Sequence, residues 1–137
     1  MMECCCMQKP DIVKEWIKYA ETDLASANHL LGMHPIPIEI ICYHCAQSAE
    51  KALKAFLIAK DVEPPRTHDL RFLNRLCSRH DRDFQQLEQA CIELTAYATQ
   101  PRYPFMIEIS SNDMKQALLA ADKILKFVLT KLQLEDQ

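Results

Sequence analysis

The arginines of this 137-residue chain are gathered in one part of the sequence. All six lie within residues 66–102, and no lysine lies within residues 61–114. Arg71, Arg75 and Arg79 are spaced by four, so a helix places them on one ridge. A guanidinium group binds phosphate or carboxylate through paired hydrogen bonds. The sequence therefore predicts a phosphate-binding surface, although the net charge is −3. The alternative is a solvated face that pairs with acidic neighbours, namely Asp69, Asp81 and Asp83.

Two short motifs flank this ridge. Arg66-Thr-His68-Asp-Leu follows two prolines and opens the predicted helix that carries the ridge, with Thr67 or His68 near its N-cap. This motif is either a capped turn or an anion site made by Arg66 and the helix N-terminus. Arg102-Tyr103-Pro precedes the last predicted helix. An arginine beside an aromatic ring can hold a phosphate and a base. The same two side chains can instead close the end of a helical bundle.

Residues 42–57 combine an apolar stripe of helical period with regularly spaced polar side chains. Glu50 precedes Lys54 by four residues, which is the favourable order for an ion pair on one helix. Lys51 and Lys54 are secondary candidates for ligand binding. Cys42-Tyr-His-Cys45 resembles part of a zinc site, but a structural zinc site needs further ligands at matching spacing. We therefore expect packing thiols and no metal.

The composition excludes several classes of protein. Glycine occurs once, which excludes the glycine-rich phosphate loops, and no cofactor is expected. Seven cysteines without a secretion signal predict free thiols, including the adjacent Cys4, Cys5 and Cys6. No apolar run reaches the length of about 18 residues that a membrane span needs. We therefore expect a cytoplasmic protein that does not enter a membrane.

Five segments of helical period must position these residues, and the prolines fall at their boundaries. They predict an all-α, up-and-down antiparallel bundle of four long helices and one short helix. The bundle domain is predicted at residues 11–134, after a disordered tail at 1–10. Nearly half of the residues are hydrophobic, and part of this surplus predicts a homodimer face. The predicted helical segments are 11–31, 37–60, 69–79, 84–98 and 112–132.

The stretch 42–57, the Arg66-Thr-His68-Asp-Leu motif and Arg102-Tyr-Pro104, in this order, resemble the HEPN family over residues 13–132. The resemblance implies an all-helical domain associated with nucleotide and RNA handling. It also implies a small nucleotidyltransferase as partner, as in a toxin–antitoxin-like pair.

Nucleolytic members of the HEPN superfamily carry an arginine followed, after four to six residues, by a histidine. Two such pairs across a dimer cleft can activate a ribose 2′-hydroxyl and stabilise a developing phosphorane. No histidine follows Arg102, whereas Arg75 and His80 have this spacing but lie in the short third helix. The predicted function is a nucleotide- or RNA-binding module. One alternative is a metal-independent RNase that uses Arg75 and His80, and another is a non-catalytic homodimeric scaffold. The predicted ligand-binding residues are Arg66, His68, Arg71, Arg75, Arg102, Tyr103, Lys51 and Lys54.

Overall fold

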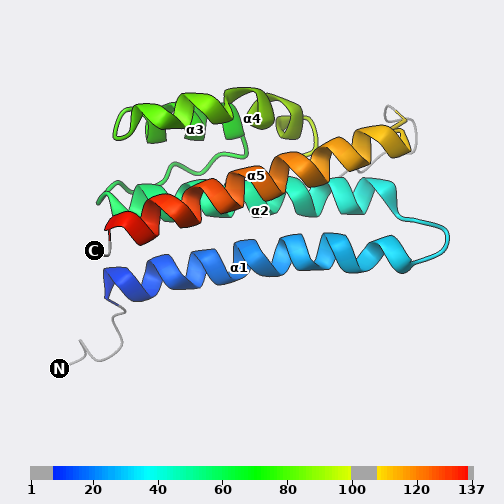
Figure 1. The fold of residues 1–137 in the computed structure, drawn as a ribbon, viewed down its shortest axis with the longest axis horizontal. Coiled ribbons are helices and arrows are strands. Elements are labelled where there is room, and N and C mark those ends of the chain that lie inside the picture. The colour runs from blue at the N-terminus through cyan, green and yellow to red at the C-terminus, as the bar shows by residue number, and fades with distance from the viewer. Residues whose placement is uncertain (1–7, 100–107, 136–137) are drawn as a thin grey trace.

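The chain folds as a bundle of helices in a computed structural model that describes residues 8–99 and 108–135 (Figure 1). No strand occurs within these ranges, which confirms the predicted all-α class. None of the helices in the described ranges is both long enough and apolar enough to cross a membrane. The elements are α1 (Lys9–His29), η2 (Leu30–Gly32), α2 (Ile38–Ala59), α3 (Leu70–Ser78), η3 (Arg82–Leu87), α4 (Glu88–Thr95) and α5 (Ser111–Glu135).

The helix boundaries differ from the predicted ones at two places. α1 begins at Lys9, inside the predicted tail, because a proline is tolerated in the first turn of a helix. The predicted fourth long helix is divided into the 3₁₀ helix η3 and the eight-residue α4. Phe84 and Leu87 are both buried, since side chains three residues apart share one side of a 3₁₀ helix. Among the α-helices of the described ranges, three are therefore long and two are short.

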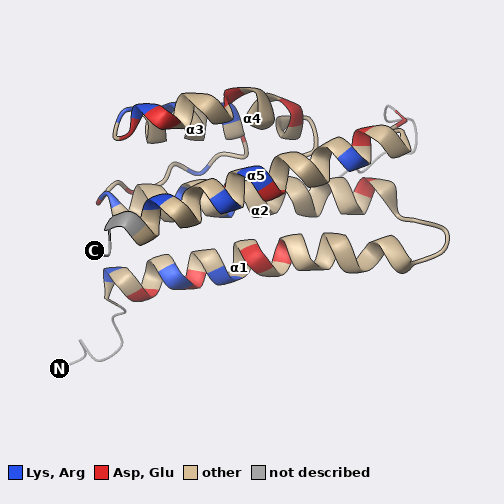
Figure 2. Ribbon diagram, in the orientation of Figure 1, with Lys and Arg blue, Asp and Glu red and all other residues tan. Residues whose placement is uncertain are grey.

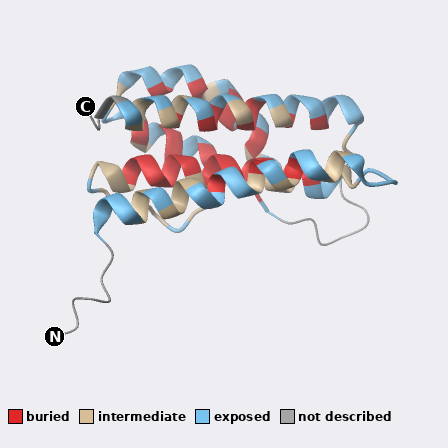
Figure 3. Cartoon of the chain, turned by 60° about the horizontal axis from the view of Figure 1, so that its bottom comes forward, coloured by how far each residue is buried: buried red, intermediate tan, exposed pale blue. Residues whose placement is uncertain are grey.

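α2 is the central element of the bundle. It contacts α1, α3, α4 and α5, and it is buried along most of its length (Figure 3). In Figure 1, α1 lies on one side of α2 and α5, and α3 with α4 lies on the other side. The core includes an aromatic contact between Phe56 and Phe84, whose ring centroids are 4.3 Å apart. Phe127 adds an edge-on contact to Phe84 at 5.0 Å, so α2, η3 and α5 share one apolar cluster.

The start of α5 matches its predicted N-terminus. The Ser110 N–H donates to Asp113 Oδ2 at 3.0 Å, and the Asp113 N–H donates to Ser110 Oγ at 3.0 Å. These reciprocal bonds form a capping box. The hydrogen bonds from the backbone and side chain of Ser110 lower the pKa of Asp113 below its ordinary value.

Candidate functional site

The arginine ridge lies on the outer face of α3. Leu70, Leu73 and Cys77 of this helix are buried in the core, whereas Arg71 and Arg75 are exposed. Arg79 continues the ridge at the C-cap of α3, and Arg82 follows at the start of η3. All four side chains are exposed. We call Arg71, Arg75, Arg79 and Arg82 the arginine surface. Figure 2 shows the basic residues of α3 on the side of the bundle opposite α1.

The acidic neighbours that the alternative interpretation pairs with these arginines bind other groups. Lys131 Nζ lies 2.9 Å from Asp81 Oδ2 and 2.6 Å from Asp83 Oδ2. Burial opposes ionisation of Asp81, but hydrogen bonds from Lys131 and the Asp83 N–H hold the pKa of this carboxyl below its ordinary value. Asp69 bonds to the backbone of α3. Each of these three carboxylates therefore already binds Lys131 or backbone N–H groups of α3.

Only one member of the arginine surface forms an ion pair with a described residue. Arg71 Nη2 lies 3.6 Å from Glu88 Oε2, and both side chains are about half exposed. Such a pair contributes little, at about 0–1 kcal/mol. Within residues 8–99 and 108–135, the other arginines have no carboxylate partner; these are Arg66, Arg75, Arg79 and Arg82. The arginine surface thus keeps unpaired guanidinium groups.

The start of α3 is a capped turn. Its N-cap is Asp69, directly after Thr67 and His68, and the Asp69 carboxylate accepts the N–H groups of Arg71 at 3.1 Å and Phe72 at 3.2 Å. Thr67 Oγ1 instead accepts the Asp69 N–H at 3.1 Å. The capped turn is thus confirmed, whereas anion binding by Arg66 stays a prediction.

A buried ion pair on α2 holds the segment before α3. Glu50 is 5% exposed and Lys54 is 9% exposed, and Lys54 Nζ lies 2.8 Å from Glu50 Oε2, which confirms the predicted pair. His68 Nδ1 lies 3.0 Å from the other oxygen of Glu50. Lys54 also lies 5.9 Å from the ring centroid of Trp16 on α1. Glu50 therefore ties α2 to the connection that carries the Arg66-Thr-His68 motif.

A second carboxylate, Asp23 of α1, joins α1 to α2 in the same way. His44 Nδ1 lies 3.0 Å from Asp23 Oδ1, and Lys51 Nζ lies 2.5 Å from Asp23 Oδ2. Lys51 and Lys54, the secondary ligand candidates, therefore both have internal carboxylate partners; their role in ligand binding stays a prediction. Sequence reasoning missed Asp23, although an acidic residue next to the buried Leu24 was a usable signal.

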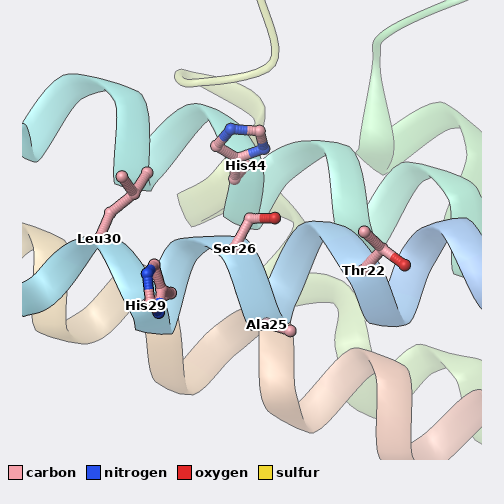
Figure 4. A pocket seen from close by; sticks show the side chains of 6 residues that line it. All are labelled: Thr22, Ala25, Ser26, His29, Leu30 and His44. Carbon is pink, nitrogen blue, oxygen red and sulfur yellow. The ribbon is translucent and has the colours of Figure 1, made fainter.

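A surface hollow of about 550 Å³ opens beside His44 (Figure 4). Its lining includes imidazole and hydroxyl groups but no lysine, arginine or carboxylate, so it offers hydrogen bonds without a fixed charge. It lies between α1 and α2, across the bundle from the arginine surface. The lining residues are Thr22, Ala25, Ser26, His29, Leu30 and His44.

The remaining predicted site residues are Arg75, His80, Arg102 and Tyr103. Arg75 and His80 are both exposed, and no hydrogen bond or ion pair joins their side chains in the described part of the chain. Arg102 and Tyr103 lie outside the described residues. The structure adds one residue that sequence reasoning missed: Phe72 on α3 is 42% exposed. The sequence pattern could have indicated that Phe72 is exposed, because this residue lies outside the leucine stripe of that helix.

The described thiols behave as packing groups. They are buried, and burial raises the pKa of Cys42 to about 11 and that of Cys45 and Cys91 to about 12. Thiols with a raised pKa are poor nucleophiles and poor metal ligands at neutral pH. Cys4, Cys5 and Cys6 lie outside the described residues.

Comparison with known families agrees with this architecture. A family model described as the HEPN domain matches residues 13–132. The chain belongs to the HEPN family. Two crystal structures resemble this HEPN protein. One is TT1696 from Thermus thermophilus, with 26% sequence identity, a TM-score of 0.71, and coverage of 87% of this chain and 97% of that chain. The other is ST0689, described as an archaeal HEPN homologue, with 25% identity, a TM-score of 0.65, and coverage of 87% and 96%. A comparison with curated proteins found no match.

Proposed function

We propose that this HEPN protein is a nucleotide- or RNA-binding helical module and that its arginine surface contacts the phosphates. One observation carries the proposal: Arg75, Arg79 and Arg82 are exposed, and the nearby carboxylates are bound to Lys131 or to the α3 backbone. Guanidinium groups without internal partners are free to form bidentate bonds to phosphate. Membership of the HEPN family supports this ligand class.

Phosphate binding by these arginines leads to a quantitative prediction about RNA affinity and its dependence on salt concentration. Changing Arg75 and Arg79 together to Ala should weaken binding of a short single-stranded RNA by about 1–3 kcal/mol per lost contact. Each neutralised phosphate releases counterions, so the slope of log K against log salt should fall in magnitude by about 1.4 for two contacts. Fluorescence anisotropy of a labelled RNA over a salt series measures both quantities.

A charge-matched variant controls for general electrostatics. Lys14 and Lys18 are exposed on α1, on the opposite side of the bundle from α3. Changing both to Ala removes the same charge and should leave affinity and slope close to those of the wild type. Wild-type protein that shows no salt-dependent affinity for RNA or nucleotide at low ionic strength would refute the proposal. RNA that stays intact during the titration supports a binding module over an RNase.

The proposal extends to partners. We propose a homodimer and an association with a small nucleotidyltransferase, which the HEPN membership supports. Exposed apolar side chains in the connection between α1 and α2 and in the first turn of α2 offer surface for such contacts; they are Met33, Ile36 and Ile40.

A further inference from the structure

Phe72 is an aromatic side chain that the core does not use. The ring of Phe72 is 42% exposed on α3, whereas Phe56 and Phe84 are fully buried and pack against each other. Leu70 and Leu73 of α3 are buried in the bundle, so Phe72 lies on the outer face together with the arginines. Exposing an aromatic ring forgoes the stabilisation that burial would give. The side chains that surround Phe72 on the surface indicate which kind of ligand its ring contacts.

Helix geometry places Phe72 among the unpaired arginines. At 3.6 residues per turn, Phe72, Arg75 and Arg79 fall within an arc of about 60° on the outer face of α3. Phe72 and Arg75 are one turn apart, and Arg79 follows after one more turn. Arg75 and Arg79 have no carboxylate partner among the described residues. An exposed ring is therefore flanked by guanidinium groups that are free to bind an anion.

We propose that Phe72 stacks on a base of a single-stranded nucleic acid whose phosphates contact Arg75 and Arg79. This inference rests on the proposed function and deepens it, because it assigns the strand type and a stacking residue. Proteins that bind single strands combine cations that track the backbone with aromatic rings on which bases stack. A base within a duplex has both faces covered by its neighbours, so it cannot offer a face to Phe72. The surface should therefore prefer single strands over duplexes.

The surroundings of Phe72 favour a nucleic acid over an acidic protein segment. Aromatic side chains and arginine are both enriched in protein–protein interfaces, but the buried core of such an interface is a larger, more apolar patch. Phe72 instead shares its face with arginines, with only the half-buried Leu76 as an apolar neighbour along that side of α3. One isolated ring among cations suits a base and its phosphates better than it suits an apolar protein surface.

The test compares Phe72→Leu and Phe72→Tyr with the wild type. Stacking on an aromatic ring predicts that Phe72→Leu weakens binding of a single-stranded RNA by about 5- to 150-fold. The salt slope should not change, because no charge is lost. Affinity for a duplex of the same length should also stay constant. Phe72→Tyr retains a ring and should keep most of the affinity. A 2-aminopurine base in the RNA reports stacking on Phe72 through the change in its emission on binding, and Phe72→Leu should abolish this change.

Matched controls separate this inference from the proposed function. Tyr19→Leu removes an aromatic ring that is 52% exposed on α1, and it should leave RNA binding unchanged. Unchanged single-strand affinity in Phe72→Leu overturns the stacking inference, while a loss in the Arg75 and Arg79 double variant still supports the proposed function. Equal losses for single strand and duplex also overturn it. Binding of an acidic peptide, in place of RNA and with the same dependence on Phe72, would assign the surface to a protein partner and refute both.

Discussion

The buried ion pair between Glu50 and Lys54 offers a sharp test of the packing described above. Replacing Glu50 by Gln keeps the side-chain shape but removes the negative charge that Lys54 and His68 share. Lys54 is only 9% exposed, so its ammonium would be left without a counter-charge in a nearly dry position. An uncompensated buried charge is costly, and the protein should lose stability.

The size of this loss follows from the contacts. Removing one partner of a buried ion pair costs about 3–5 kcal/mol. The amide oxygen of Gln still accepts one hydrogen bond, which reduces the expected loss to about 2–3 kcal/mol. For a domain of this size, a loss of 1 kcal/mol lowers Tm by about 4 °C, so Tm should fall by about 8–12 °C. Adding Lys54→Met to Glu50→Gln removes the uncompensated charge and should restore most of the stability.

Urea unfolding followed by far-ultraviolet circular dichroism measures these differences. The matched control is Asp122→Asn, because Asp122 and Lys126 form a pair of the same spacing on α5 at 2.9 Å, but on the surface. Breaking this exposed pair should cost less than about 0.5 kcal/mol. If Glu50→Gln and Asp122→Asn have equal stabilities, or if the double variant is less stable than Glu50→Gln, the assigned role of the buried pair is refuted.

Two further perturbations test the caps and links around α3. Asp69→Ala should destabilise the protein by about 1 kcal/mol, because two backbone N–H groups lose their acceptor. Asp69→Asn should retain most of the stability. Equal midpoints of urea unfolding for the two variants would contradict the role of Asp69 as N-cap. Lys131→Met should lower the free energy of unfolding at pH 7, because Asp81 and Asp83 lose the ammonium group that both contact. Because the folded-state pKa of Asp81 is lowered, its contribution is present above the ordinary value of about 3.9 and is lost as pH falls through the folded pKa. The difference between Lys131→Met and the wild type should therefore shrink below about pH 4, and a difference that grows there would refute the link.

Local features of the sequence predicted most of the secondary structure. Apolar residues spaced by three and four marked α1, α2, α3 and α5, since burial of one helix face depends on this period. The capping box at Ser110 and Asp113 and the pair Glu50–Lys54 were also predictable, because each joins residues only three or four apart. The division of the fourth segment into η3 and α4 was not predictable, because a weak apolar pattern fits both helix types.

Long-range contacts decided which charges are free. The sequence by itself determined that six arginines lie within residues 66–102 and that three of them form a ridge. Only the tertiary structure determined that Lys131, 48 residues after Asp83, engages the acidic neighbours of this ridge. Likewise, Asp23 neutralises Lys51 from a position 28 residues earlier in the chain. Ion pairs depend on distance in space, and helix packing sets that distance, so no local pattern reveals whether a charged side chain is paired or free to bind a ligand.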